Sequence, residues 1–230
     1  MKSILRYFTK SEWILWGVSV FFIISSFIVF SKDGLITLTA SLLGVTAIII
    51  NAKGNPAGQA MMVVFGIMYS IISYKTAYYG ELATYAGMTS PMALFSFISW
   101  VKNPYRKNKA EVKINTISRK EVYFMFVLSV PVTAVFFFIL RYFGTARLLV
   151  STLSVTTSFI AVYLTFRRTI YFSLAYALND IVLIVLWGLA SFYDTSCISV
   201  LICFVSFLAN DIYGFISWKK MLKRQKSGIL

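Results

Sequence analysis

The chain has 230 residues, of which 59% are hydrophobic and only 13% are charged. A soluble domain is about half apolar and about one-quarter charged, so this composition excludes an ordinary soluble domain and indicates a membrane protein with several spans. The formal net charge of +14 does not favour nucleic-acid binding, because most Lys and Arg residues lie in short loops and tails beside apolar segments, as membrane topology requires. The chain contains no His, which removes imidazole catalysis and most zinc sites. We expect no cofactor, no metal and no nucleic-acid partner.

Eight apolar segments are long enough to cross a membrane as helices, which requires about 20 residues. In chain order they cover residues 13–30, 35–51, 59–79, 83–101, 122–142, 148–166, 171–192 and 196–218. The first follows a basic start and has no small-residue cleavage pattern, so we interpret it as a helix and not as a signal peptide. The second is short, has ends rich in Thr, Ser and Gly, and is the weakest candidate for a complete span.

The distribution of Lys and Arg predicts the orientation of these spans. With eight spans, the two termini and the connections after spans two, four and six share one side, which holds 18 of the 22 basic residues. Such an excess marks the cytoplasmic side, so we expect a multi-pass protein of the cell membrane with both termini in the cytoplasm. Residues 102–120, the longest basic stretch, are expected to form a solvated cytoplasmic connector near anionic lipid headgroups.

A short internal repeat suggests how the spans are organised. Phe97-Ile98-Ser99-Trp100 ends the fourth span, and Phe215-Ile216-Ser217-Trp218 ends the eighth, 118 residues later. Four spans separate the copies, so both have the same orientation, as in transporters whose parallel repeats bind substrate between two halves. We predict an all-α polytopic membrane protein with about eight transmembrane helices, in which one extra helix precedes a 3+1+3 parallel repeat. The expected parts are an N-terminal tail and extra helix (1–30), a first three-helix repeat (31–101), a basic cytoplasmic connector (102–120), a linking helix (121–142), a second three-helix repeat (147–218) and a basic cytoplasmic tail (219–230).

Two Asn-Asp dipeptides lie well inside apolar segments, Asn179-Asp180 in the seventh and Asn210-Asp211 in the eighth. Ionisable side chains inside a bilayer are costly, and they often mark substrate or ion pathways. Each Asn lies eight residues from the cytoplasmic end of its span, which at ~1.5 Å per residue is about 12 Å into the membrane. Because consecutive spans are antiparallel, we expect the two dipeptides at one depth, where they could meet or face one cavity.

Helical spacing extends each dipeptide into a polar and aromatic face. The seventh span presents Tyr176, Asn179, Asp180, Leu183 and Trp187, and the eighth presents Asn210, Asp211, Gly214 and Trp218, with Tyr213 at the edge. Amides and carboxylates bind sugar hydroxyls, while Tyr and Trp rings stack on a flat heterocycle, especially a cationic one. The alternatives are that Asn joins helices, that Asp pairs with hydroxyls, and that Trp218 belongs to the interfacial aromatic belt.

The first repeat is poorer in charge, because the positions 118 residues before the two Asn-Asp dipeptides are Met61-Met62 and Met92-Ala93. Its polar candidates are Asn51, Asn55, Gln59, Tyr69 and Tyr74. Gln59 follows a turn-rich loop and fits either a pocket or a helix start that faces headgroups. A pocket this asymmetric suits a ligand with two different ends. Cys197 and Cys203 are expected to be packing residues rather than a disulfide or a metal pair.

Five stretches carry a recognisable pattern: Asn51-Ala52-Lys53-Gly54-Asn55-Pro56, Ala77-Tyr78-Tyr79-Gly80-Glu81, Pro91-Met92-Ala93-Leu94 leading to Ser99-Trp100, Leu178-Asn179-Asp180-Ile181-Val182-Leu183, and Asn210-Asp211-Ile212-Tyr213-Gly214-Phe215. They resemble the PnuC family of vitamin transporters over roughly residues 30–222. The resemblance implies a fold like that of the SWEET sugar transporters, with three plus one plus three helices and an additional helix here. It also implies uptake of nicotinamide riboside, a precursor of NAD, by facilitated diffusion that cytoplasmic phosphorylation makes one-way.

Family binding sites are rich in Trp, Asn and Gln, and this description maps onto Gln59, Asn179, Trp187 and Asn210. The chain lacks a clear pair of tryptophans four residues apart in one span, and Tyr176 and Tyr213 are the candidates to replace them. Nicotinamide riboside carries a positive ring, a ribose diol and a carboxamide, which suit carboxylates, amides and aromatic faces. We therefore expect substrate contacts from Gln59, Tyr69, Tyr176, Asn179, Asp180, Trp187, Asn210, Asp211 and Tyr213, with the amides ranked above the aspartates.

Other functions stay open from the sequence. One is a carrier of thiamine or another cationic vitamin, and another is a proton-coupled carrier in which Asp180 or Asp211 takes a proton. We expect no enzyme, because no catalytic set is visible, and a purely structural subunit would leave the two Asn-Asp dipeptides unexplained. The expected partners are the small-molecule substrate and the lipid bilayer, and a homo-oligomer is left open.

Overall fold

The computed structural model describes residues 7–30, 34–75, 79–106, 108–145 and 147–227. The elements in chain order are α2 (Lys10–Phe30), α3 (Leu35–Ala52), α4 (Pro56–Lys75), α5 (Tyr79–Thr84), the π-helix η1 (Tyr85–Thr89), α6 (Ser90–Lys102), β1 (Pro104–Tyr105), β2 (Asn108–Val112), α7 (Arg119–Tyr142), α8 (Leu148–Phe166), α9 (Phe172–Ser191) and α10 (Cys197–Ser227). The basic residues Lys2, Arg6 and Lys32 and the Ala77-Tyr78 part of the family pattern lie outside the described residues.

Seven of the described helices are long and apolar enough to cross a membrane, namely α2, α3, α4, α7, α8, α9 and α10. The segment predicted as the fourth span consists of three consecutive helical pieces, α5, η1 and α6. The prediction of an all-α polytopic membrane protein is confirmed, and α3, the weakest predicted span, is a continuous helix of 18 residues. The division into a 3+1+3 repeat stays a prediction.

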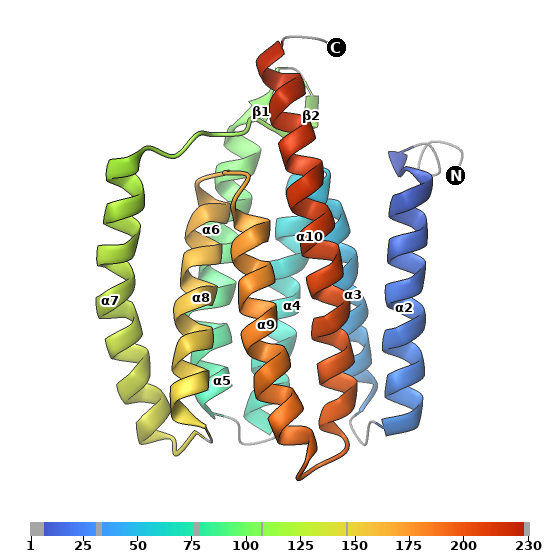
Figure 1. Ribbon diagram of the computed structural model, residues 1–230, viewed down its shortest axis with the longest axis vertical. Helices are drawn as coiled ribbons and strands as arrows, with labels where there is room; N and C mark the ends of the chain where they lie inside the picture. Colours follow the sequence, from blue (N-terminus) through green and yellow to red (C-terminus); the bar gives the residue numbers. More distant parts are fainter. Residues whose placement is uncertain (1–6, 31–33, 76–78, 107, 146, 228–230) are drawn as a thin grey trace.

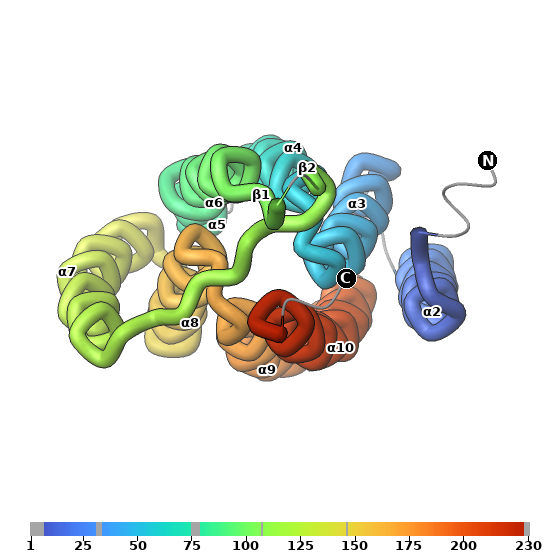
Figure 2. Tube along the Cα trace, turned by 90° about the horizontal axis from the view of Figure 1, so that it is seen from above, coloured from blue at the N-terminus to red at the C-terminus, as the bar shows by residue number. Residues whose placement is uncertain are grey.

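The helices stand side by side in two rows (Figures 1 and 2). Seen from above, α6, α4 and α3 form one row and α8, α9 and α10 form the other, while α7 and α2 lie at opposite ends of the bundle. α2 begins and α10 ends where β1 and β2 lie, and we call this end of the bundle the connector side. The end at which α7 and α9 finish is called the opposite side.

The connector between α6 and α7 is more ordered and more buried than the solvated loop expected over residues 102–120. β1 and β2 pair antiparallel, and Val112 and Ile114 are buried among the apolar residues at the connector side. α10 continues as a helix beyond the predicted span to Ser227, so the tail expected from residue 219 is largely helical. This extension covers the connector, because Arg224 forms an ion pair with Glu111 and Gln225 Oε1 accepts a hydrogen bond from the Ile114 backbone N–H at 2.9 Å. The solvated-loop prediction holds for the exposed basic residues of this stretch and fails for Val112 and Ile114, because it considered the charges and not the alternating apolar residues.

Short polar motifs mark the beginnings of two helices that flank the rows. The Glu12 backbone N–H donates to Thr9 Oγ1 at 3.3 Å, while the Thr9 N–H donates to the Glu12 carboxylate at 2.7 Å, which is a capping box at the start of α2. At the start of α7, the Glu121 N–H donates to Ser118 Oγ at 3.3 Å. α2 and α7 therefore begin at the connector side with the same Ser/Thr-x-x-Glu pattern.

Glycines bring α10 close to its neighbours in both rows. A Cβ atom added at Gly44 of α3 would lie 2.7 Å from the ring of Phe207, and one added at Gly214 of α10 would lie 2.8 Å from Ser173 Oγ of α9. Small residues at such contacts let helix backbones approach, which is the usual basis of helix association in membranes. This close packing holds the middle of α10 beside the polar part of α9.

Candidate functional site

A cavity of about 490 Å³ lies between the two rows of helices. Its volume falls in the range of about 300–1,000 Å³ that is typical of sites for small molecules. Residues of α3, α4, α5 and η1 form one part of the wall, and residues of α8, α9 and α10 form the other. Both halves of the bundle therefore contribute side chains to one shared space.

α9 contributes a continuous stripe to the cavity wall. Tyr176, Asn179, Asp180, Leu183 and Trp187 all line the cavity. Counted from Tyr176 they stand at positions i, i+3, i+4, i+7 and i+11, which places them on one face of a helix. The face predicted for this span is confirmed.

Asn179 is held by two hydroxyl groups of α8. Its side-chain oxygen Oδ1 accepts hydrogen bonds from Thr157 Oγ1 at 2.7 Å and from Ser158 Oγ at 3.0 Å. These contacts fix the amide orientation, because only the oxygen can accept. Among the described residues no acceptor contacts the amide nitrogen Nδ2, so this group can donate to a molecule in the cavity.

Asp180 of α9 and Asp211 of α10 form an acidic pair in the wall. Their side chains are only 3% and 5% exposed, and the two carboxyl groups lie close enough to interact. The Oδ2 atom of Asp180 is buried and meets no hydrogen-bond donor among the described residues. Buried carboxylates need a compensating charge or a proton, so this pair is suited to a cationic ligand.

Gln59, near the start of α4, supplies a second amide from the other half of the bundle. Its Nε2 donates to Asn51 Oδ1 at 3.0 Å, and both residues line the cavity. The close approach of α3 and α4 here requires Gly58, since a Cβ at that position would lie 2.3 Å from Asn51 Oδ1. The hydrogen bond to Asn51 uses one of the two N–H groups of Nε2, so the Oε1 atom and the second N–H of Gln59 are left to meet a solute.

Aromatic rings line the cavity from both halves. Phe65 and Tyr69 of α4 have ring centroids 4.8 Å apart, and Tyr69 and Tyr85 have centroids 4.9 Å apart. Tyr85 opens the five-residue π-helix η1, a kind of segment that is frequent at functional sites. Tyr176 and Trp187 of α9 add aromatic surface on the other side.

The two ends of the cavity differ in their exposure to solvent. Tyr79 and Phe143, which line it at the opposite side, are 41% and 45% exposed. Phe172 and Ser173, which line it at the connector side, are both buried. Among the described residues, the cavity lining is exposed at the opposite side and buried at the connector side, which we call the closed end of the cavity.

The sequence and the fold both match known transporters. A family model described as a nicotinamide mononucleotide transporter matches residues 34–220. The chain belongs to this family, which includes PnuC. It is 25% identical over 200 residues to the nicotinamide riboside transporter PnuC of Neisseria mucosa, an alignment that covers 85% of this chain and 76% of the relative. The crystal structure of the vitamin B3 transporter PnuC has the same fold, with a TM-score of 0.80 at 23% identity, covering 95% of this chain and 94% of that one. The protein is thus a multi-pass membrane transporter of the PnuC type.

In this PnuC-family chain, seven of the nine residues expected to contact substrate line the cavity. They are Gln59, Tyr69, Tyr176, Asn179, Asp180, Trp187 and Asp211. Both Asp residues are among them, so the structure gives no reason to rank the amides above the carboxylates. Their contact with substrate stays a prediction.

Asn210 and Tyr213 lie elsewhere, and their placement differs from the expectation. Asn210 is fully buried, and its Nδ2 donates to Ser19 Oγ of α2 at 2.8 Å and to the Ser206 carbonyl at 2.7 Å. Tyr213 Oη donates to the Glu12 carboxylate at 2.9 Å. Neither is among the described residues that line the cavity, because α2 packs against this face of α10. The expectation failed because helical spacing predicts which residues share a face of α10 but does not predict which helix packs against that face.

Several cavity residues were not identified from the sequence. On α8, Ser151, Ser154, Ser158 and Val162 line the wall, and their three- to four-residue spacing is a signal that the sequence does contain. Glu81 and Tyr85 also line it, but from the composite helix. They lie four residues apart, which puts them on one helical face, and the π-helix that begins at Tyr85 changes the register only of the residues after it, in α6.

Proposed function

We propose that this protein takes up nicotinamide riboside across the cell membrane by facilitated diffusion, and that phosphorylation in the cytoplasm traps the product. The observation that carries the proposal is a cavity in which an acidic pair, two amides and aromatic rings from both halves meet in a PnuC-type fold. The name of the Neisseria mucosa relative, a nicotinamide riboside transporter, supports the choice of substrate.

The cavity chemistry suits each part of this substrate. Asp180 and Asp211 offset the fixed positive charge of the pyridinium ring, and Tyr69 and Tyr176 offer faces on which that ring can stack. Asn179 donates through Nδ2 to a ribose oxygen or to the carboxamide oxygen. Gln59 accepts through Oε1 from a ribose hydroxyl or from the carboxamide NH₂. The described lining residues include three acids, Glu81 being the third, and a single base, Arg147.

The proposed orientation has the connector side in the cytoplasm. The described basic residues concentrate there, on the connector, on the turn between α8 and α9 and on the extension of α10. Such enrichment is typical of the cytoplasmic face of membrane proteins. Both termini would then be cytoplasmic, and the cavity would face outward to collect substrate.

Uptake into liposomes that contain the purified protein tests the proposal. Radiolabelled nicotinamide riboside should equilibrate faster than in empty liposomes, and the plateau should equal the outside concentration in the absence of any gradient. Excess unlabelled nicotinamide riboside should block tracer uptake, and excess thiamine should not. Equilibration no faster than in empty liposomes refutes the proposal, and block by thiamine with no block by nicotinamide riboside assigns the carrier to another cationic vitamin.

A proton-coupled carrier is the second candidate, and the contact between Asp180 and Asp211 is the observation that favours it. Two carboxyl groups in contact away from water can hold a proton in exchange for a cation. Imposing a pH gradient on the same liposomes separates the candidates. Accumulation above the outside concentration that a protonophore abolishes indicates coupling, whereas an unchanged plateau indicates facilitated diffusion.

A further inference from the structure

The first copy of the Phe-Ile-Ser-Trp repeat joins one half of the bundle to the other. Trp100 Nε1 of α6 donates to the Thr165 carbonyl of α8 at 2.9 Å. Ser99 Oγ donates to the next carbonyl, that of Phe166, at 3.0 Å. Both acceptors lie in the last turn of α8, where backbone carbonyls have no partner within the helix.

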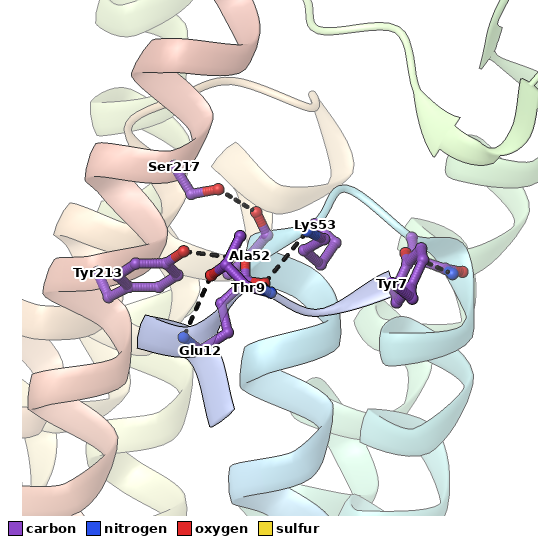
Figure 3. Close-up of polar contacts among 8 residues, drawn as sticks. Tyr7, Thr9, Glu12, Ala52, Lys53, Tyr213 and Ser217 are labelled. Atoms are coloured by element: carbon purple, nitrogen blue, oxygen red, sulfur yellow. Dashed lines mark hydrogen bonds and ion pairs between the residues drawn. The ribbon is translucent and has the colours of Figure 1, made fainter. Parts of the chain in front are cut away.

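The second copy makes the same contacts in the reverse direction. Trp218 Nε1 of α10 donates to the Asn51 carbonyl of α3 at 2.8 Å, and Ser217 Oγ donates to the Ala52 carbonyl at 2.7 Å. The contact of Ser217 with Ala52 is visible in Figure 3. These acceptors lie in the last turn of α3. Each Ser-Trp pair thus binds the end of the first helix of the other row.

The two Trp side chains meet at the closed end of the cavity. Both are 0% exposed, and their ring centroids are 5.2 Å apart. Phe172, which lines the cavity at this end, has its ring centroid 4.7 Å from that of Trp218 and 6.0 Å from that of Trp100. The paired rings therefore stand between the cavity and the connector side.

The helix ends that accept these bonds are themselves fixed by ion pairs. Lys53, which follows α3, contacts the Glu12 carboxylate of α2 at 3.2 Å, and Tyr213 of α10 donates to the same carboxylate (Figure 3). Arg167, which follows α8, pairs with Glu121 of α7. In each half, a carboxylate from the first turn of the flanking helix holds the end that the Ser-Trp pair binds.

We propose that Ser99, Trp100, Ser217 and Trp218 form the gate on the connector side of the transport path. We call these four residues the Ser-Trp latch. The proposal rests on the proposed transport function, since a gate has meaning only for a carrier. Opening this side separates α6 from α8 and α10 from α3, which breaks all four hydrogen bonds. Each freed donor and carbonyl can then form a hydrogen bond with water that enters, so the free-energy cost of the open state is moderate.

Side-specific labelling of a cavity cysteine tests the latch. The probe is Val162→Cys, a cavity position of α8 about one turn before the latch acceptors, in a background with Cys197→Ser and Cys203→Ala. A membrane-impermeant methanethiosulfonate is added to spheroplasts, to reach the outer face, and to inverted vesicles, to reach the cytoplasmic face. Without latch changes, we expect labelling mainly from the outer face. In Trp100→Phe with Trp218→Phe, which keeps two rings and removes two donors, labelling from the cytoplasmic face should rise by at least about fivefold.

Trp13→Phe is the matched control, because the buried Trp13 Nε1 has no hydrogen-bond partner among the described residues. It should leave both labelling rates unchanged. Size-exclusion profiles must show that the double variant is folded. If a folded double variant labels from the cytoplasmic face no faster than the control, the latch is not the gate. This readout needs no substrate, so it stands even if nicotinamide riboside is not transported.

A disulfide between α3 and α10 tests the opposite case, in which the connector side cannot open. Ala52→Cys with Gly214→Cys, three residues before Ser217, places two Cβ atoms 3.9 Å apart between α3 and α10, a separation that suits a disulfide, and Ser173→Ala makes room for the added side chain. After oxidation, substrate equilibration should stop while the probe cysteine stays open to the outer face, and reduction should restore equilibration. Full transport with the disulfide formed would overturn the proposal.

Discussion

Replacing Asn179 by Ala is expected to weaken the binding of nicotinamide riboside by about fivefold to about 150-fold. Asn179 lines the cavity, its Nδ2 group has no acceptor among the described residues, and Thr157 and Ser158 fix the Oδ1 atom. A substrate oxygen left without its donor costs about 1–3 kcal/mol, which converts to this range of affinity. The two hydroxyls keep other partners in α8 or can meet water from the cavity, so the fold should tolerate the change.

Asn210→Ala is the informative comparison, because both residues begin an Asn-Asp dipeptide. Asn210 is buried between α10 and α2 and donates to Ser19 and to the Ser206 carbonyl. Hydrogen bonds between membrane helices contribute about 0.6–2 kcal/mol. Asn210→Ala should therefore lower the thermal unfolding temperature and leave the Kd for nicotinamide riboside within about twofold of the unsubstituted protein.

Both quantities can be measured on purified protein in detergent, the Kd by isothermal titration calorimetry and the unfolding temperature by tryptophan fluorescence. Asn108→Ala in β2, outside the predicted membrane region, serves as the control and should change neither. Equal losses of affinity in Asn179→Ala and Asn210→Ala, at unchanged thermal stability, would refute the assignment of these two residues. An unchanged Kd in Asn179→Ala would move the amide contact elsewhere.

Three further outcomes follow from the same contacts. Asp180→Asn should weaken the binding of nicotinamide riboside about tenfold and the binding of its uncharged reduced form much less, because a charge pair in a partly desolvated site contributes about 1–2 kcal/mol. Equal losses of affinity for the two ligands would argue against a charge contact. Gly44→Val should lower the unfolding temperature by an amount equivalent to about 1–3 kcal/mol, because its Cβ would lie 2.7 Å from the Phe207 ring. Gly17→Ala is its control, with nothing within 4 Å of the added Cβ. Glu12→Gln should also lower the unfolding temperature, because Glu12 joins α2 to Lys53 and to Tyr213. It should leave the Kd unchanged, because neither Lys53 nor Tyr213 is among the described residues that line the cavity. A changed Kd would place α2 in the binding site.

The features that the sequence predicted well depend on local pattern. Apolar length gave the spans, because a bilayer fixes the length of a helix that crosses it. The stripe of Tyr176, Asn179 and Trp187 could be predicted because α9 is regular and its residues keep the helical period. Antiparallel neighbours and equal depth predicted that the two Asn-Asp dipeptides could meet or face one cavity, and Asp180 and Asp211 do both.

The features that the sequence did not predict depend on how helices pack against one another and on irregular helix geometry. The helical period of α10 groups Asn210 and Tyr213 with Asp211, but only the position of α2 decides that Ser19 and Glu12 meet them. The composite helix is a second case. Its π-helix η1 changes the register between Tyr85 and α6, and periodicity analysis assumes that no such change occurs.

The internal repeat is visible over only four residues, and the contacts explain why. Ser99 and Trp100 act through side-chain donors, so the same residue types must recur in Ser217 and Trp218 for the same bonds to form. Their acceptors are backbone carbonyls, which any residue provides, so the ends of α3 and α8 can differ completely in sequence. A helix end that accepts through its backbone places no demand on its own side chains. Sequence similarity between the two halves is therefore concentrated on the donor side of the interface, and a comparison of the two halves by sequence alone underestimates how alike their contacts are.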